Sequence, residues 1–442
     1  MPIKTIPGTS LKYYLIAFDA AGKEREDDPD GLMSKVVLDV LANQSITDVF
    51  LISHGWLGDI PAAEQQYNKW ITAMVANQAD IEKMKRLRPG FSPLIIGLHW
   101  PSLPWGNEEL GGDSVSFDTT EVSAVQQLID DYAHRIADTK VSRQALETIF
   151  TAAMEDIAPD TLPPSVREAY EILNRESSLL CQGEAAAPGR DREPFDAESI
   201  FKAANSSNES VNFGSIDFSG ILAPLRILSF WKMKDRARQF GETGGFELLT
   251  KMQKAASETV RFHLMGHSFG SIVVSATVNG SLDTENLVRP VDSLVLVQGA
   301  LSIWSYCSDI PVAPGRAGYF HSLIDQNKVA GSIITTTSEY DIALRKIYPI
   351  GAGISQQIVF DPNQLPKYAA LGTFGASGPG LDVVDMKMQP LDGSYNFEPG
   401  KIYNLESSEF ISDMSDGDFG GAHNDIAKPE VAHAVWSAAF GS

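Results

Sequence analysis

Short runs of apolar residues recur along the chain at intervals that suit the strands of one sheet. Several of these runs read as continuously hydrophobic instead of alternating, which is typical of strands buried on both faces of a parallel sheet. Segments between the runs have the apolar period of helices. This alternation predicts an α/β protein with a doubly wound, mostly parallel sheet. The runs lie at residues 13–18, 48–53, 94–100, 261–265, 293–297, 332–337 and 401–405, and the clearest helical segments at 61–79, 271–279 and 429–440.

Two connections between these runs are far longer than the helical crossover that parallel strands need. The first, residues 101–245, has an amphipathic helical pattern near its start and again at 222–240. Residues 181–219 are rich in Gly, Pro, Ser, Asn and charge, which favours a flexible loop. We expect residues 101–245 to form a mainly helical cap or lid, inserted into an α/β core made of residues 1–100 and 246–442.

The second long connection, residues 343–399, contains a glycine-rich stretch at 371–380. Such a stretch resembles a phosphate-binding loop in composition, but it lacks the lysine of a P-loop and does not open an apolar helix. We therefore interpret it as a turn-rich surface loop.

Charge and hydropathy narrow the possible partners. The 35 basic and 57 acidic side chains give a net charge of −22, which would repel nucleic acid and anionic membrane surfaces. No run approaches the roughly 20 apolar residues of a membrane span, and the first residues lack the pattern of a secretory signal. We expect a cytoplasmic protein with no integral membrane segment and no nucleic-acid partner.

Metal and disulfide chemistry find no support in the sequence. The two cysteines, Cys181 and Cys307, cannot make a disulfide framework or a four-ligand zinc site. No cluster of the HExxH kind occurs either. We therefore expect no metal and no cofactor.

The pentapeptide GHSFG at residues 266–270 is the strongest sign of chemistry. It follows the apolar run 261–265 and precedes the helical segment 271–279, which gives a strand, a sharp turn and a helix. Glycines on both sides of the serine leave room for the strand to fold back into the helix. Ser268 would then stand at the carboxyl edge of the sheet, near the positive end of a helix. We interpret Ser268 as a nucleophile.

A serine hydroxyl becomes a good nucleophile only when a base takes its proton, so we look for that base among the eight histidines. His423 lies in a loop after the last expected strand and just before the last helix. The chain order serine, acid, histidine requires the base at this place. His433 is the rival, but it lies inside the final helix. We predict His423 as the base.

The acid that orients His423 should follow a strand between the serine and the histidine. Asp341 comes directly after the run 332–337 and meets this requirement. Glu339 and Asp309 are alternatives, and Asp341 could instead cap the helix that follows it.

The oxyanion that forms during acyl transfer needs two backbone N–H donors. One belongs to the residue after the nucleophile, Phe269. The loop His54-Gly55-Trp56 follows the run 48–53, and its Trp56 is the natural second donor. The glycine lets this backbone approach closely, and we expect a structural role for His54.

Together, the HGW loop, the GHSFG pentapeptide and the late loop histidine resemble the α/β-hydrolase superfamily, and HGW resembles the oxyanion loop of its lipases and esterases. The resemblance covers the expected sheet but not residues 101–245. It implies an α/β-hydrolase fold, with a triad made of Ser268, Asp341 and His423. It also implies Trp56 and Phe269 as oxyanion donors. One departure is the large insertion, which precedes the nucleophile strand, whereas many lipases place their lid after it.

The function that fits all these residues is cleavage of a small-molecule or lipid carboxylic ester through an acyl-enzyme on Ser268. An amidase, a peptidase or an acyltransferase would use the same triad, because only the leaving group or acceptor differs. A non-catalytic hydrolase scaffold used for binding is the remaining alternative. The sequence identifies no substrate-binding residue.

Overall fold

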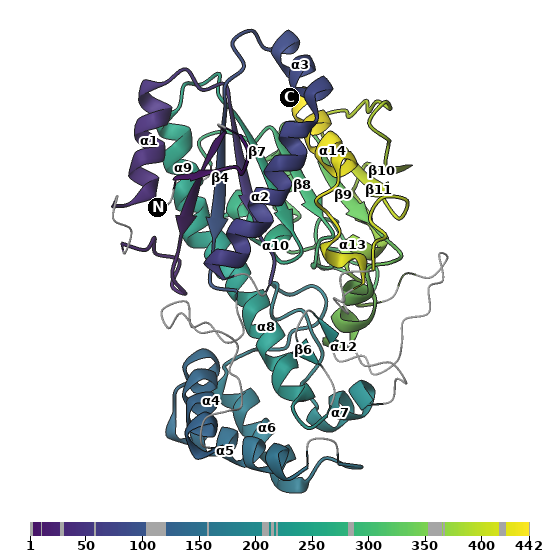
Figure 1. The fold of residues 1–442 in the computed structure, drawn as a ribbon. Helices are drawn as coiled ribbons and strands as arrows, with labels where there is room; N and C mark the ends of the chain where they lie inside the picture. Colours follow the sequence, from purple (N-terminus) through teal and green to yellow (C-terminus); the bar gives the residue numbers. More distant parts are fainter. Residues whose placement is uncertain are drawn as a thin grey trace.

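A nine-stranded sheet forms the centre of the protein (Figure 1). The computed structural model describes residues 3–441 apart from 10, 27–30, 57–58, 103–120, 157–158, 206–211, 214–215, 218–219, 282–286, 352–364, 366 and 415–420. In sheet order the strands are β1 (Ile3–Thr5), β2 (Lys12–Ala17), β4 (Pro93–His99), β3 (Asp48–Ser53), β7 (Arg261–His267), β8 (Ser293–Val297), β9 (Ile333–Thr337), β11 (Ile402–Glu406) and β10 (Val383–Lys387).

Within this sheet β1 pairs with β2 in antiparallel fashion, and the other pairings between described strands are parallel. The α/β class and the mostly parallel sheet expected from the sequence are therefore confirmed. A separate two-stranded ribbon joins β5 (Asn212–Phe213) and β6 (Ile216–Asp217).

Helices cover both faces of the sheet, which explains why inner strands such as β3 have unbroken apolar runs instead of alternating apolar and polar residues. In β3, Val49 and Leu51 enter one hydrophobic cluster, while Phe50 and Ile52 enter another on the opposite face. The first cluster is completed by α1 (Met33–Asn43), α9 (Phe246–Ala255) and α10 (Gly270–Asn279). The second is completed by α2 (Ile60–Ala76), α3 (Gln78–Leu87) and α14 (Pro429–Phe440).

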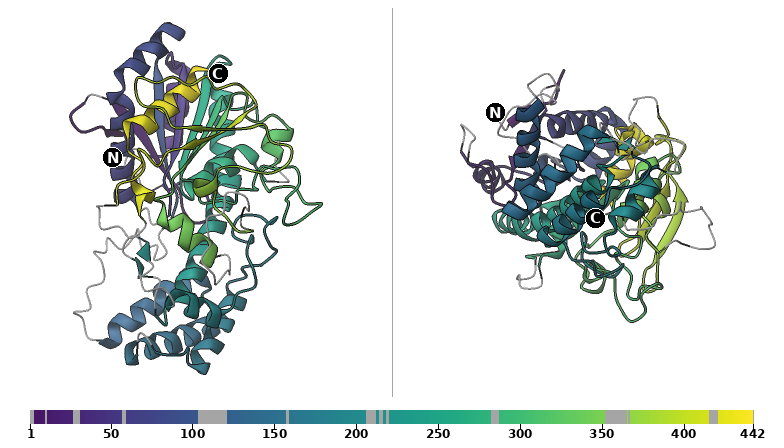
Figure 2. Two further views of the ribbon diagram at one scale, coloured as in Figure 1. Left: turned by 90° about the vertical axis from the view of Figure 1, so that its right-hand side faces the viewer. Right: turned by 90° about the horizontal axis from the view of Figure 1, so that it is seen from below.

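A group of helices lies below the sheet in the view of Figure 1, and the side view in Figure 2 shows the same arrangement. Its members are α4 (Glu121–Ile136), α5 (Lys140–Glu155), α6 (Pro164–Glu176) and α7 (Ala197–Asn205). They share a third hydrophobic cluster. The long helix α8 (Ala223–Phe240) runs from this group to the sheet and enters both clusters, with Leu225 and Leu228 in one and Ile227 and Phe230 in the other.

The remaining described turns of helix are short. None of the helices in the described ranges is both long and apolar enough to cross a membrane. The short turns are η1 (Gly241–Gly245), α11 (Ser322–Asp325), η2 (Ala343–Ile347), α12 (Tyr348–Gly351), α13 (Leu371–Phe374) and η3 (Ala422–Asn424).

Two segments differ from the sequence expectation. Part of the expected flexible loop at 181–219 forms α7, because its apolar residues recur at helical spacing and Asp196 Oδ1 accepts from the Ser199 N–H at 3.3 Å. Before α7, Lys234 Nζ of α8 donates to the buried Asp191 Oδ2 at 2.5 Å. The expected surface loop at 371–380 begins as the buried helix α13, since Leu371 packs in the core.

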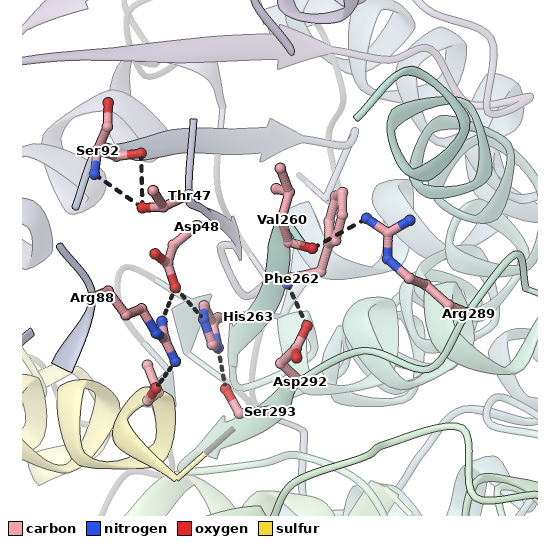
Figure 3. Close-up of polar contacts among 11 residues, drawn as sticks. Thr47, Asp48, Arg88, Ser92, Val260, Phe262, His263, Arg289, Asp292 and Ser293 are labelled. Carbon is pink, nitrogen blue, oxygen red and sulfur yellow. Dashed lines mark hydrogen bonds and ion pairs between the residues drawn. The ribbon is translucent and has the colours of Figure 1, made fainter. Parts of the chain in front are cut away.

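A buried polar network joins the amino ends of β3, β7 and β8 (Figure 3). Asp48 Oδ1 accepts from Arg88 Nη1 and also from His263 Nε2, the latter at 3.1 Å. His263 Nδ1 lies 2.9 Å from Ser293 Oγ, and Arg88 Nη2 donates to the Ala439 carbonyl at 2.6 Å. The network ties three strands to α14 at the edge of the sheet opposite to Ser268, so we assign it to stability.

Asp48→Ala should lower the free energy of unfolding by about 3–5 kcal/mol, because it leaves the Arg88 guanidinium buried without its carboxylate. Urea unfolding followed by circular dichroism measures the loss. Glu82→Ala breaks an exposed pair with Lys85 and should leave the unfolding midpoint where it is in the unaltered protein. Equal midpoints for the two variants would contradict the role given to Asp48.

The same network should make stability depend on pH. Burial lowers the pKa of His263 from 6.5 to about 3, so the folded ring stays neutral where the unfolded ring takes a proton. Its contribution is complete above about pH 6.5 and is lost as the pH falls toward 3. Between pH 6.5 and 5, the free energy of unfolding should fall by about 2 kcal/mol more in the unaltered protein than in His263→Gln. Urea unfolding at both pH values tests this, and identical losses would refute it.

Candidate active site

Ser268 occupies a strained turn between β7 and α10. Its φ is 54°, in the left-handed region that a residue with a Cβ rarely adopts. The surrounding backbone holds it there, because the Ser268 N–H donates to the Val297 carbonyl at 3.1 Å and the Ser268 carbonyl accepts from the Ala300 N–H at 3.1 Å. Such strain at one serine is typical of a nucleophile elbow.

The glycines around Ser268 are required by close contacts. A Cβ on Gly266 would overlap the Gly270 carbonyl, and a Cβ on Gly270 would lie 2.6 Å from the His54 carbonyl oxygen. A Cβ on Gly55 would lie 2.8 Å from the Cβ of Ser268. The GHSFG turn and the HGW loop are therefore packed against each other through their glycines.

The strand order explains why these two loops meet. β3 and β7 are parallel neighbours, with Ser53 opposite Gly266. The chain leaves β3 toward β4 on one side and leaves β7 toward β8 on the other. In open α/β sheets, ligands bind at the carboxyl ends of two strands whose connections diverge in this way. Both candidate loops lie at this place.

Asp341 and His423 are brought together from the loop after β9 and the turn η3. Asp341 Oδ2 lies 2.7 Å from His423 Nδ1, and both residues are buried. The backbones also pair, since Asp341 forms an antiparallel bridge with Gly421 and the Ala422 N–H donates to the Tyr340 carbonyl at 2.9 Å. Since Nδ1 donates to the carboxylate, Nε2 of the neutral ring carries the lone pair that a base needs.

The alternative acids lie elsewhere. Glu339 is exposed, although it is only two residues from Asp341. Asp309 Oδ1 accepts from the Gly315 N–H at 2.6 Å in its own loop. Neither carboxylate takes the place of Asp341 beside His423.

The rival base His433 has an aspartate of its own. Its Nδ1 lies 2.8 Å from Asp80 Oδ2, so α14 is joined here to α3. Asn77 adds a bond from its side-chain amide to the Pro429 carbonyl at 2.8 Å. The geometry imitates a catalytic histidine and aspartate, but it anchors two helices and does not involve the loop that carries Asp341.

Trp56 and Phe269 are brought together by the packing of their rings. Their ring centroids are 6.0 Å apart, and Phe230 of α8 contacts both, at 5.4 Å from Trp56 and 4.9 Å from Phe269. Phe269 is the N-cap residue of α10, and the first N–H groups of a helix have no partner within it. These backbone positions are suited to donate to a developing oxyanion.

His54 has the structural role expected of it. Its Nδ1 lies 2.8 Å from the Gly55 carbonyl, and its Nε2 lies 3.0 Å from His99 Nδ1. Burial lowers its pKa to about 3, so the ring stays neutral and fixes the shape of the HGW loop.

His267 has a role that the sequence did not suggest. Its Nε2 donates to the His423 carbonyl at 2.9 Å, and its Nδ1 accepts from Gln66 Nε2 at 3.2 Å. Burial, together with the neighbouring His423, lowers the pKa of His267 well below its usual value. His267 therefore holds the backbone of the loop that carries His423, and the centroids of the two histidine rings are 4.8 Å apart.

No group of His, Cys, Asp and Glu side chains suited to a metal ion occurs among the residues that the structure describes. Comparison of the chain with protein-family models, with curated proteins and with solved structures found no match. The geometry of the site is therefore the basis on which a function is proposed.

Proposed function

We propose that this chain is a serine hydrolase of the α/β-hydrolase fold that cleaves carboxylic esters through an acyl-enzyme on Ser268. The observation that carries the proposal is that one structure contains both a strained elbow at Ser268 and a buried hydrogen bond of 2.7 Å between Asp341 and His423. The chain order Ser268, Asp341, His423 is that of α/β-hydrolases. The link from His267 to the His423 carbonyl supports the closeness of base and nucleophile.

In the proposed reaction, Ser268 Oγ attacks the ester carbonyl carbon while His423 Nε2 takes the hydroxyl proton. The carbonyl electron pair moves to oxygen, and the N–H groups of Trp56 and Phe269 stabilise the oxyanion. Collapse of this intermediate expels the alcohol, which receives the proton from His423. Water then attacks the acyl-enzyme in the same manner and releases the carboxylic acid.

A panel of model substrates tests this proposal. Nitrophenyl esters of increasing chain length, measured beside a nitroanilide of the same acyl group, rank ester against amide cleavage. An ester hydrolase should favour the ester strongly. Faster anilide cleavage would assign an amidase, transfer to an added alcohol would assign an acyltransferase, and no turnover of any substrate would favour a binding scaffold.

Phe230 should influence which acyl groups fit, because its ring contacts both Trp56 and Phe269. Phe230→Ala removes a large apolar group beside the proposed oxyanion donors. We expect the ratio of kcat/KM for octanoate to that for acetate esters to rise by about 10-fold or more, since a few methylenes in a pocket give discrimination of this order.

Phe201→Ala is the matched control for this effect. Phe201 is also buried, but it lies in the cluster of α4–α7. This variant should lose stability and leave the chain-length ratio as it is in the unaltered protein. An unchanged ratio in Phe230→Ala would contradict the role of α8 in substrate choice.

A further inference from the structure

Gln298 adopts an unusual backbone conformation next to the site. It follows β8 directly, is fully buried and has a φ of 45°. Among the residues that the structure describes, Ser178, Ser268, Gln298 and Asn327 are the non-glycine residues with positive φ. Two of these four therefore stand at the carboxyl ends of the neighbouring strands β7 and β8. Strain retained at a residue with a long side chain points to a use for that side chain.

The side chain of Gln298 is bonded to the proposed acid. Its Nε2 donates to Asp341 Oδ2 at 2.9 Å, and Oδ2 is the same oxygen that accepts from His423 Nδ1. The other oxygen, Oδ1, accepts from the Leu344 N–H at 2.9 Å. Both carboxylate oxygens are therefore held by amide donors, and that of Gln298 acts on the oxygen that faces His423.

Thr336 of β9 holds the other end of the Gln298 amide. The Asp341 carboxylate can only accept hydrogen bonds, so Nε2 must face Asp341 and Oε1 must face Thr336. Thr336 Oγ1 accepts from the Gln298 backbone N–H at 2.9 Å and donates its one hydrogen to Gln298 Oε1, also at 2.9 Å. The carboxylate therefore determines the amide orientation, which is otherwise ambiguous for a glutamine, and the hydroxyl stabilises it.

Helix α13 holds the backbone of Gln298 in place. A Cβ on Gly372 would lie 2.6 Å from the Gln298 carbonyl carbon, so the two backbone segments are in close contact. The Gly372 N–H donates to the Gly299 carbonyl at 2.9 Å, and the Gly372 carbonyl accepts from the Ser338 N–H at 3.1 Å. The start of the glycine-rich stretch therefore ties Gln298 to the loop that carries Asp341.

We infer that Gln298 is a positioning residue of the proposed hydrolase, which holds the Asp341 carboxylate in the rotamer that orients His423, while Thr336 holds the Gln298 amide in place. The inference rests on the proposed function for its catalytic consequence. In this role Gln298 acts through Asp341 and not on the substrate. It acts by limiting rotation of the carboxylate, and a misplaced base costs rate more than it costs binding.

Four variants test the inference. Gln298→Gly removes the amide and relieves the positive φ, while Gln298→Glu keeps the shape and replaces the donor with an oxygen. Thr336→Val removes the hydroxyl that donates to Gln298 Oε1, and Thr336→Ser keeps a hydroxyl at this position. In Gln298→Gly, Gln298→Glu and Thr336→Val we expect kcat per active site to fall about 10- to 100-fold, with KM within about threefold of that of the unaltered protein. In Thr336→Ser we expect kcat to stay close to that of the unaltered protein.

A proton NMR signal makes the test independent of turnover. The His423 Nδ1 proton shared with Asp341 should give a downfield resonance, assigned by its loss in His423→Ala. This resonance should shift or broaden in Gln298→Gly, Gln298→Glu and Thr336→Val, and should persist in Thr336→Ser. Circular dichroism confirms that each variant is folded.

Two results would overturn the inference. One is an unchanged resonance and kcat in folded Gln298→Glu and Gln298→Gly. The other is a loss of folded protein with unchanged kcat per active site, which would make Gln298 purely structural. If the unaltered protein hydrolyses nothing, the proposed function fails, and the resonance alone still decides whether Gln298 positions Asp341.

Discussion

Ser268→Ala is expected to lower kcat/KM for a nitrophenyl ester by at least about 10³-fold, with the protein still folded. The proposed reaction passes through a covalent acyl-enzyme, and alanine provides no oxygen to form it. Ser268 is packed in the elbow by backbone hydrogen bonds that the substitution keeps. Alanine at a φ of 54° also keeps the same backbone strain, so the effect on folding should be small.

Ser275→Ala provides the matched control. Ser275 is also a buried serine of the segment that follows β7, and its hydroxyl bonds to the Ser271 carbonyl and to Tyr306. This variant should retain activity within a few-fold. Equal activity in Ser268→Ala and the unaltered protein would remove Ser268 from the mechanism.

His423→Ala is expected to lower kcat about 10³- to 10⁴-fold, whereas His433→Ala should change kcat only a few-fold. Both histidines have a carboxylate within 2.8 Å of Nδ1, so burial and pairing alone do not identify the catalytic base. Their surroundings distinguish them, because His423 is hydrogen-bonded to His267 of the elbow, whereas His433 is hydrogen-bonded to Asp80 of α3. His433→Ala should instead lower stability, because Asp80 remains buried without its partner.

A comparison of Asp341 with Glu339 tests which carboxylate is the partner of His423. Asp341→Asn should cost a similar factor to His423→Ala, since an amide in this place favours the wrong tautomer of the ring. Glu339→Gln alters an exposed side chain and should leave kcat unchanged.

Loss of turnover in His433→Ala with none in His423→Ala would contradict the assignment of the base.

The sequence predicted the buried strands well, because their physical signal is local. Strands such as β3 and β8 contain unbroken apolar runs, at 49–52 and 294–297, and their bounds agree with the runs at 48–53 and 293–297. The edge strands β1 and β10 were missed. β10 contains Asp385 and Lys387 and is only partly buried, so it lacks the apolar run of an inner strand. The short helix α7 was missed because polar residues on both sides of it dominated the composition of residues 181–219.

The candidate site was predictable as far as chain order determines it. Ser268, Asp341 and His423 each follow a strand of the parallel sheet or lie in a late loop, and carboxyl ends of parallel strands meet at one edge. Gln298 and His267 could not be found in this way. Their roles depend on a positive φ, on which side-chain atom faces which neighbour, and on the packing of loops distant in sequence.

The sequence pattern did not connect α8 with the candidate site. Phe230 belongs to α8, which the sequence places in the insertion, yet its ring lies against Trp56 and Phe269. An apolar segment within a long insertion predicts burial but not the partner against which it is buried. The contact between α8 and the two loops links the insertion to the proposed chemistry.

Labelling with a fluorophosphonate tests whether Ser268 is a nucleophile, because the reagent forms a stable bond only with an activated serine. The unaltered protein should gain one phosphonyl group, and peptide mass spectrometry should place it on Ser268. Ser268→Ala and heat-denatured protein should gain none, and His423→Ala should react far more slowly. Labelling at another residue, or no labelling of folded protein by either a small or a long-chain fluorophosphonate, would contradict the account.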